Sequence, residues 1–380
     1  MATFARPRVD VAVESLRVSA YRVPLEQTES DGTLEWDSTT CVVIEADAVG
    51  ERGLGYTYGD VSIATMVESK LSSVVAGTDA LSPPAAWSKM QRAIRNAGRP
   101  GVGAMAISAV DVALWDLKAR LLGVPLAALL PRFHDRVPIY GSGGFCSYSN
   151  ERLQEQMQAW VEMDIPRLKI KVAREPGRDP ERIRAVREVI GDRELFVDAN
   201  GAYQRKQALE WAHRFHEELG ITYLEEPLTS EDLAGLRMLR DQGPPGLSIA
   251  AGEYSWNLFY SNGLIEGGCV DILQADVTRI GGITETLRVD GLAKARSLPF
   301  SAHCAPAISA HVCCAMETAK HIEYFHDHVQ VENLLFDGTL EPAGGYLEPD
   351  RSRPGLGLEL KRDDAARYLV HDSIEEKAKP

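Results

Sequence analysis

The stretch RLKIKV (Arg167–Val172) alternates as a β-strand does, and it places Lys169 and Lys171 on the same face. Two like charges side by side on a half-buried strand repel each other. A solvent-exposed edge strand tolerates such a pair, whereas a strand that ends at an anion-binding site has a use for it. The segments before and after this stretch decide between the two interpretations.

Short apolar strands alternate with helical stretches from about Val137 onward. The intervening segments, such as 180–190, 205–219 and 284–295, carry apolar residues at helical spacing. Strands separated by helices at this spacing form parallel βα units, and eight of them predict a closed α/β barrel. The eight predicted strands are VPIYGS (137–142), RLKIKV (167–172), LFVDAN (195–200), TYLEEP (222–227), SIAAGE (248–253), DILQAD (271–276), PFSAH (299–303) and HIEYF (321–325).

The first 130 or so residues have a different character. Val11–Val23 and Thr40–Ala46 read as strands, and Gly103–Leu122 as a helix that ends at a Gly and a Pro. The polar segment Glu26–Ser38 between the strands, and LGYTYGD (Leu54–Asp60), are predicted to be lid loops. This part of the chain is predicted to be a small α+β domain.

The division of the chain follows from these patterns. We expect an α+β capping domain over residues 1–132 and a barrel domain over residues 133–345 that carries the active site. The segment 329–380 contains many Gly and Pro residues and reads as an irregular strand-and-loop tail. Its part from about 346 to 380 is predicted to pack back on the first domain.

Composition excludes several classes of partner. The 380 residues carry 41 Lys and Arg against 55 Asp and Glu, a formal charge of −14, so nucleic acid and anionic membrane surfaces are not expected partners. No apolar run is long enough to span a bilayer, and MATFARPRVD lacks the apolar core of a signal peptide. The six cysteines form no CxxC pair and are expected to be free thiols in the cytoplasm, with Cys304 notable because it follows His303.

A polar or charged residue stands at the end of each predicted strand, at intervals of about one βα unit. A barrel gathers such strand ends around a single mouth, so groups scattered over the sequence converge on one cavity. A single acidic residue after a strand is more often a helix cap or a loop charge, but a complete series is not. The series is Ser142, Lys169, Lys171, Asp198, Glu225, Glu253, Asp276, His303 and Glu323.

Asp198, Glu225 and Glu253 are predicted to bind one magnesium ion. Three crowded carboxylates repel and raise one another's pKa, and a divalent cation removes that penalty. Oxygen ligands with open positions favour Mg²⁺, and the absence of His and Cys from this set makes zinc less suitable here. Lys169 and Lys171 then acquire a role, because each lowers the pKa of the other and a nearby Mg²⁺ is expected to lower both. A lysine tuned in this way can act as a base.

The remaining strand-end residues have expected roles around this ion. Asp276 is predicted to fix the tautomer of His303, although a core histidine is the simpler alternative. For Glu323, a protonated carboxyl that donates to a substrate oxygen and a salt bridge that closes the barrel are equally plausible. Asn200 is expected to contact substrate, as is Ser142, whereas Glu226 is expected to point elsewhere and support the lysines by its charge.

These residues together resemble the enolase superfamily, in its mandelate racemase branch. The matching pieces lie at barrel spacing in the order KIK (169–171), VDAN (197–200), LEEP (224–227), AGE (251–253), DVTRIGGI (276–283), SAH (301–303) and IE (322–323), preceded by the helix ISAVDVALWDLKARLLGVPL (107–126). The resemblance implies a modified (β/α)₇β barrel with an α+β capping domain, and symmetric homo-oligomers. It also implies removal of the proton next to a substrate carboxylate, with Mg²⁺ stabilising the enediolate.

Carried over by motif, Asp198, Glu225 and Glu253 would be metal ligands, and Lys171 would be a base beside Lys169. His303, oriented by Asp276, would be the acid or base on the other face of the substrate, and Glu323 a donor to its carboxylate. Dehydration of a hydroxylated sugar acid to a 2-keto-3-deoxy acid is the favoured reaction, since similar sequences with KxK and a His–Asp pair are more often dehydratases than racemases. Asn200 departs from the pattern, because some such dehydratases carry a second histidine there, so His303 would have to protonate the leaving group.

Other functions remain open at this point. A racemase or epimerase of a 2-hydroxy acid is the main alternative, because two bases on opposite faces permit reprotonation. A cycloisomerase is less favoured, since those relatives usually carry lysine in place of His303. A non-catalytic carboxylate-binding protein would be expected to have gaps in the ring of acids and bases, and a Mg²⁺-dependent aldose isomerase would be expected to use histidine ligands.

Overall fold

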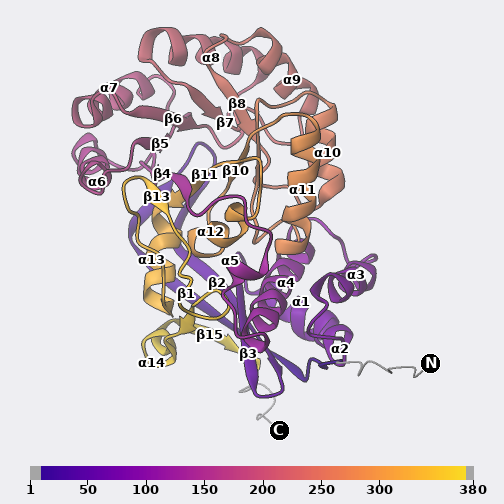
Figure 1. The fold of residues 1–380 in the computed structure, drawn as a ribbon. Helices are drawn as coiled ribbons and strands as arrows, with labels where there is room; N and C mark the ends of the chain where they lie inside the picture. The colour runs from indigo at the N-terminus through magenta and orange to yellow at the C-terminus, as the bar shows by residue number, and fades with distance from the viewer. Residues whose placement is uncertain (1–9, 374–380) are drawn as a thin grey trace.

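The computed structural model describes residues 10–373 and contains a barrel with a second domain packed against it (Figure 1). The N-terminal residues quoted above as lacking a signal sequence, and the ends of the predicted domain ranges, fall on 1–9 and 374–380, outside the described part. No helix among the described residues has the length and apolar character needed to cross a membrane.

Eight parallel strands close the barrel. Neighbouring strands are hydrogen-bonded in sequence order from β4 to β11, and β11 pairs back onto β4, with Glu323 beside Tyr140. The predicted barrel is therefore confirmed. Its strands are β4 (Val137–Gly143), β5 (Arg167–Lys171), β6 (Glu194–Asp198), β7 (Tyr223–Glu225), β8 (Ser248–Ala251), β9 (Ile272–Ala275), β10 (Phe300–Ala302) and β11 (Ala319–Phe325).

Helices that follow the barrel strands form the outer layer, since each amphipathic helix buries its apolar stripe against the sheet. The last of them shows that the predicted irregular tail is wrong over its first residues, which belong to α13. The helices are α6 (Asn150–Glu162), α7 (Asp179–Ile190), α8 (Arg205–Leu219), α9 (Leu233–Gln242), α10 (Leu258–Glu266), α11 (Ile283–Ala295), α12 (Pro306–Cys314) and α13 (His326–Leu335).

Inside the barrel a small apolar cluster fills the space beneath the mouth. It consists of Tyr140, Phe196, Tyr223, Ala250 and Ile272, all buried. Side chains two apart on a strand share a face, so Phe196 and Tyr223 lie one layer below the carboxylates that end β6 and β7. This floor separates the strand-end residues from the opposite end of the barrel.

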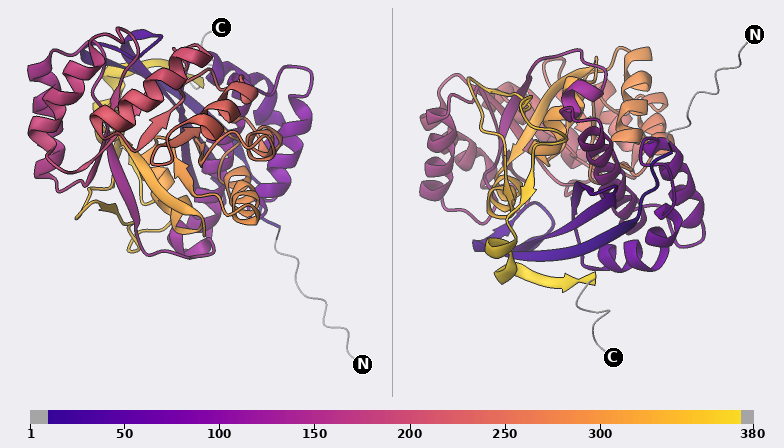
Figure 2. Two further views of the ribbon diagram at one scale, coloured as in Figure 1. Left: turned by 90° about the horizontal axis from the view of Figure 1, so that it is seen from above. Right: turned by 60° about the horizontal axis from the view of Figure 1, so that its bottom comes forward.

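The capping domain is an antiparallel sheet covered by helices. Its sheet order is β15-β1-β2-β3, and the long helix α4 packs across it (Figure 2). The tail strand β15 pairs with β1, whereas β13 pairs with β4 of the barrel. The elements of the N-terminal part are β1 (Ser15–Ser30), β2 (Glu35–Ala48), β3 (Glu51–Tyr58), α1 (Ser62–Met66), a π-helix (Val67–Leu71), α2 (Ser72–Val75), α3 (Pro83–Ala93), α4 (Val102–Leu121) and α5 (Leu126–Leu129). Those of the C-terminal segment are β12 (Phe336–Asp337), β13 (Tyr346–Leu347), β14 (Glu359–Leu360), α14 (Arg362–Ala365), a 3₁₀ turn (Ala366–Tyr368) and β15 (Leu369–Asp372).

Neither predicted lid segment is a long loop, although Thr33 of the first one lines the cavity described below. Most of 26–38 belongs to a continuation of the β1–β2 ribbon, whose register shifts between Pro24 and Glu29. Only a tight turn remains, in which Asp31 Oδ1 accepts the N–H groups of Thr33 and Leu34 at 2.6 and 2.7 Å. The segment 54–60 is mainly the buried strand β3.

Candidate active site

The strand-end residues meet at the mouth of the barrel because neighbouring strands are in register there. Lys171 lies beside Asp198 across β5 and β6, and Asp198 lies beside Glu225 across β6 and β7. All the strand-end residues predicted from the sequence are buried. Lys169 and Lys171 share a face because that face is the interior of the barrel.

Asp198, Glu225 and Glu253 present carboxylate oxygens that all lie within 4.8 Å of one another. Burial raises the pKa of Glu225 to about 8, with Lys169 opposing the shift and Asp198 adding to it. Glu225 Oε2 and Glu253 Oε2 are buried and have no protein hydrogen-bond partner. Buried oxygens without partners are costly unless a ligand binds them, so this donor set fits a hard divalent cation.

The two lysines are ion-paired to the carboxylates. Lys169 Nζ lies 2.6 Å from Glu225 Oε1, and Lys171 Nζ lies 2.5 Å from Asp198 Oδ2. Burial acts to lower the pKa of Lys171, as does Lys169, but the charges of Asp198, Glu323 and Glu253 together raise the pKa overall. The expected lowering of the Lys171 pKa by Lys169 is thus present, but the carboxylates exceed it. The lowering expected from a nearby Mg²⁺ stays a prediction. A cation that shares Asp198 would weaken this ion pair.

His303 is held by a carboxylate, as expected. Its Nδ1 lies 2.8 Å from Asp276 Oδ2, and Asp276 Oδ1 accepts the N–H and the hydroxyl of Thr278, each at 2.7 Å. Nε2 faces Glu253 Oε2 at 3.4 Å. Burial acts to lower the pKa of His303, but Glu253, Glu323 and Asp276 raise it overall.

Glu323 is a bound carboxylate. Its Oε1 accepts the hydroxyl of Ser142 at 2.5 Å and lies 2.7 Å from Lys169 Nζ. Although burial acts to raise it, the pKa of Glu323 is held well below its usual range by Lys169 and His303. Of the two roles considered, the salt bridge is present, and the protonated donor is not favoured by these contacts. Ser142 positions Glu323.

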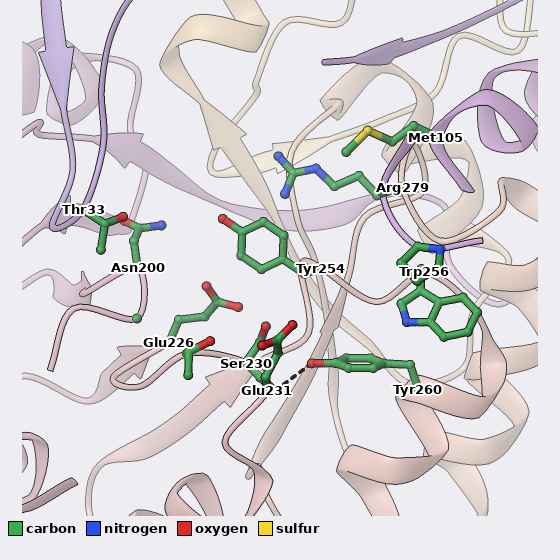
Figure 3. Close-up of a pocket in the computed structure, with 14 residues that line it drawn as sticks. Thr33, Met105, Asn200, Glu226, Ser230, Glu231, Tyr254, Trp256, Tyr260 and Arg279 are labelled. Carbon is green, nitrogen blue, oxygen red and sulfur yellow. Dashed lines mark hydrogen bonds between the residues drawn. The ribbon is translucent and has the colours of Figure 1, made fainter. Parts of the chain in front are cut away.

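A cavity of about 560 Å³ adjoins these residues (Figure 3). Its wall includes Asn200, Glu226 and Tyr254, which come directly or closely after the strand-end carboxylates in sequence, and Arg279. Glu226 thus faces the cavity, and the expectation that it points elsewhere is wrong. Its positive φ of 36° turns the chain at this position, and the charges acting on it come from Asp198, Glu225, Glu253 and Arg279 rather than from the lysines.

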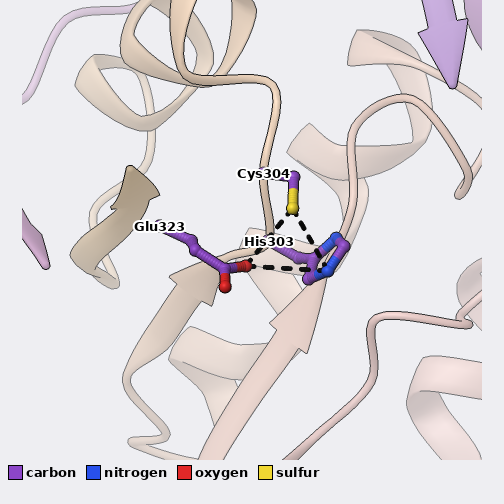
Figure 4. A group of neighbouring side chains, drawn as sticks. All are labelled: His303, Cys304 and Glu323. Carbon is purple, nitrogen blue, oxygen red and sulfur yellow. Dashed lines mark hydrogen bonds and ion pairs between the residues drawn. The ribbon is translucent and has the colours of Figure 1, made fainter. Parts of the chain in front are cut away.

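Two further residues of the site were missed from the sequence. Arg279 Nη1 lies 3.3 Å from Glu253 Oε1, and its Nε lies 3.5 Å from Asp276 Oδ2. Arg279 therefore bridges the carboxylate triad (Asp198, Glu225 and Glu253) and the His303–Asp276 pair. Its position three residues after Asp276, in the same loop, was an available signal. Cys304, which the sequence only singled out, lies against His303 and Glu323 (Figure 4).

Family models match almost the whole chain. Residues 12–131 match the mandelate racemase / muconate lactonizing enzyme N-terminal domain, and residues 152–365 match the enolase C-terminal domain-like family. The 3,6-anhydro-alpha-L-galactonate cycloisomerase of Streptomyces coelicolor is 30% identical over 92% of this chain and 98% of its own length. The L-talarate/galactarate dehydratase of Salmonella typhimurium is 30% identical over 84% of this chain and 79% of its own.

Solved structures agree. A mandelate racemase/muconate lactonizing enzyme-like protein from Rubrobacter xylanophilus has 66% identity and a TM-score of 0.93, over 94% of this chain and 100% of that one. The Salmonella dehydratase liganded with Mg and L-lyxarohydroxamate has 27% identity and a TM-score of 0.89, over 98% and 96%. A Streptomyces coelicolor racemase with bound magnesium has 29% identity and a TM-score of 0.88, over 94% and 100%. The chain therefore belongs to the mandelate racemase branch of the enolase superfamily and is an enzyme.

Proposed function

We propose that this enzyme uses Mg²⁺ to remove the α-proton of a hydroxylated carboxylate and then eliminates water, which converts a sugar acid to a 2-keto-3-deoxy acid. One arrangement carries the proposal: three carboxylates with oxygens within 4.8 Å lie between Lys171 and the His303–Asp276 pair. The dehydratase and racemase relatives whose structures contain magnesium support the choice of ion.

Asp198, Glu225 and Glu253 would hold the ion, which when bound stabilises the negative charge that develops on the substrate carboxylate. Lys171 and His303 come from β5 and β10, so they reach the substrate from different sides of the mouth. Of Lys171 and His303, the side chain that is unprotonated removes the α-hydrogen of the substrate as a proton. Lys169 and Arg279 add fixed positive charge beside the carboxylates, where it stabilises the negative charge that develops on the substrate.

Elimination then requires an acid at the β-carbon. The imidazolium of His303 donates a proton from Nε2 to the departing hydroxyl, the C–O bond breaks and water leaves. Asp276 stabilises the imidazolium through Nδ1. The resulting enol tautomerises to the 2-keto acid, so the overall change is loss of one water.

The cavity wall supports a substrate with several hydroxyls. Asn200, Glu226, Ser230 and Tyr254 all present polar groups to it, and Asn200 Oδ1 and Glu226 Oε1 are buried without a partner. Thr33 brings a further hydroxyl from the turn of the capping domain. An aromatic acid would leave these groups without hydrogen bonds.

Two alternatives use the same first step. Racemisation or epimerisation follows if the second base returns a proton to the opposite face, and the presence of both Lys171 and His303 favours it. Cycloisomerisation follows if the leaving oxygen belongs to a ring of the same molecule, and the full-length match to the Streptomyces cycloisomerase favours that reaction. Under that alternative, the substrate and product have the same composition.

A screen of mono- and di-acid sugars, their lactones and anhydro forms, in D₂O with Mg²⁺, distinguishes these reactions. Keto-acid formation with loss of water supports dehydration. Deuterium uptake into the substrate or its epimer, with no keto acid formed, supports epimerisation, and a ring-opened keto acid formed without loss of water supports cycloisomerisation.

The same assay tests the residues. Lys171→Ala and His303→Asn are each expected to abolish turnover of at least one substrate configuration, whereas Lys206→Ala and His213→Asn, on the outer helix α8, keep it. EDTA is expected to abolish turnover, and Mg²⁺ to restore it. Full activity in both Lys171→Ala and His303→Asn, or activity untouched by EDTA, would overturn the proposal.

A further inference from the structure

Three potential metal ligands form a compact triangle beside the carboxylate triad (Figure 4). His303 Nε2 lies 3.3 Å from Cys304 Sγ, Cys304 Sγ lies 3.4 Å from Glu323 Oε2, and Glu323 Oε2 lies 3.6 Å from His303 Nε2. These atoms are distinct from the oxygens that Asp198, Glu225 and Glu253 turn toward one another.

The edges of the triangle match tetrahedral coordination. Nitrogen, oxygen and sulfur ligands bind Zn²⁺ at about 2.0 to 2.3 Å, which places two ligand atoms of a tetrahedron roughly 3.3 to 3.8 Å apart. A thiolate and an imidazole are soft and intermediate donors that bind Zn²⁺ strongly and Mg²⁺ poorly. The triangle therefore selects a different cation from the all-carboxylate triad.

Surrounding contacts leave the three ligand atoms available. Asp276 holds His303 through Nδ1, which leaves Nε2 to accept a metal, as in the carboxylate–histidine–zinc arrangement. Ser142 and Lys169 bind Oε1 of Glu323, so Oε2 is the oxygen that faces the triangle. Glu253 Oε2 lies 3.4 Å from His303 Nε2 but belongs to the group formed with Asp198 and Glu225.

We propose that His303, Cys304 and Glu323 form a second, inhibitory site for a thiophilic divalent cation such as Zn²⁺, separate from the carboxylate triad. Binding releases to solvent the thiol proton of Cys304 and, from the imidazolium form, the Nε2 proton of His303, and it forms bonds to Nε2, Sγ and Oε2. The fourth position is open to water. Occupancy removes Nε2 of His303 from proton transfer and so stops turnover, whichever reaction the enzyme catalyses. The metal affinity itself does not depend on the proposed dehydration.

Cobalt binding to the full-length protein tests this site, because Co²⁺ replaces Zn²⁺ and is visible in absorption. Titration in excess Mg²⁺ is expected to give a thiolate-to-cobalt charge-transfer band that saturates at one equivalent and that Zn²⁺ abolishes. Asp198→Asn, which alters the carboxylate triad, is expected to leave the band. Absence of the band, or its loss in Asp198→Asn, would overturn the proposal.

Variants assign the band to Cys304. Cys304→Ser is expected to remove it and to weaken Zn²⁺ binding by about a hundredfold or more, since even outer partners of metal ligands cost roughly 10- to 100-fold. Cys146→Ser removes the half-buried thiol on the loop after β4 and is the matched control, with no effect expected. His303→Gln keeps the thiol and is expected to weaken Zn²⁺ binding by a similar factor. Unchanged affinity in Cys304→Ser or in His303→Gln contradicts the site.

Discussion

Asp276 acts on the proposed chemistry only through His303. It accepts hydrogen bonds from Thr278 on one oxygen and faces His303 Nδ1 with the other, so the imidazole is fixed with Nε2 toward the site. Asp276→Asn keeps the shape and removes the charge that stabilises the imidazolium. We expect kcat to fall by about 10²- to 10⁴-fold, the order seen when such a carboxylate is neutralised.

The matching measurement is Mg²⁺ binding by calorimetry. Asp276 is not in the carboxylate triad, so Asp276→Asn is expected to bind Mg²⁺ with nearly unchanged affinity while its kcat falls. The pH dependence of kcat is expected to shift to lower pH, because the neutral amide no longer raises the pKa of His303. A normal kcat with an unshifted pH profile would remove Asp276 from the mechanism.

Ser142 stabilises the molecule through Glu323. Its hydroxyl donates to Oε1 of a fully buried carboxylate at 2.5 Å. Ser142→Ala leaves that charge with one donor fewer and is expected to lower the free energy of unfolding by roughly 1.5 to 3 kcal/mol. Ser309→Ala removes a hydroxyl bonded to the neutral carbonyl of Cys304 and is expected to cost about 1 kcal/mol. Urea unfolding compares the two, and equal losses contradict this role for Ser142.

The positions of the site residues could be predicted from the sequence because each follows a strand, and strand ends in a barrel converge. Asp198 and Glu225 are direct neighbours across parallel strands for this reason. The state of each group could not be predicted in the same way. The raised pKa of Lys171 and the ion pair of Glu323 depend on distances between side chains from different strands. Glu226 faces the cavity because of a local positive φ, which no pattern announces.

At the level of elements, β3 shows why one segment was misread. LGYTYGD contains Gly and polar residues typical of a loop, but it forms a buried strand under α4. A Cβ on Gly53 would lie 2.2 Å from Ala113 O, and one on Gly55 would lie 2.2 Å from Ala109 O. The glycines are therefore there to let a helix backbone approach a sheet closely. The helix that requires these glycines, α4, lies about 60 residues away in sequence, so the residues around Gly55 do not reveal the close approach.

Gly55→Ala is expected to separate α4 from the sheet, because its methyl group meets helix backbone that cannot turn aside. We expect a loss of roughly 1 to 3 kcal/mol or more in the free energy of unfolding. Gly291→Ala is the control: it lies in the middle of α11 with no atom within 4 Å of a new Cβ. It is expected to stabilise by about 0.5 to 1 kcal/mol. Thermal unfolding measures both, and a neutral Gly55→Ala would contradict the close contact.

Across the whole molecule, ionisable groups are buried where the capping domain meets the barrel. His328 on α13 stacks on Tyr58 of β3 with ring centroids 3.5 Å apart, and Tyr56 donates to Glu332 Oε1 at 2.5 Å. Burial lowers the pKa of His328 to about 3 and raises that of Glu332 to about 8. Both groups are thus neutral near pH 6. The residues of this junction lie more than 250 positions apart in sequence. The two domains could therefore be predicted from the sequence, but the contacts between them could not.

This junction makes stability depend on pH in two opposite ways. Unfolded His328 binds a proton near pH 6.5 and the folded form does not until about pH 3, so its contribution is present above 6.5 and is lost as pH falls. Folded Glu332 keeps its proton up to about pH 8, whereas the unfolded form loses it near 4.5, so its contribution is present below 4.5 and is lost as pH rises toward 8. Each slope reaches at most about 1.4 kcal/mol per pH unit.

Substitutions separate the two slopes. Between pH 6.5 and 8, Glu332→Gln is expected to lose less stability with rising pH than the wild type, whereas His328→Gln keeps the wild-type slope. Between pH 3.5 and 4.5 the order reverses, and His328→Gln loses less with falling pH. Urea unfolding at each pH gives the slope of the free energy of unfolding against pH. The stability that a substitution costs at every pH of a window does not affect this slope. If neither variant changes its slope, these two groups are not buried neutral at a fixed junction, and the capping domain is not held against α13 as the structure places it.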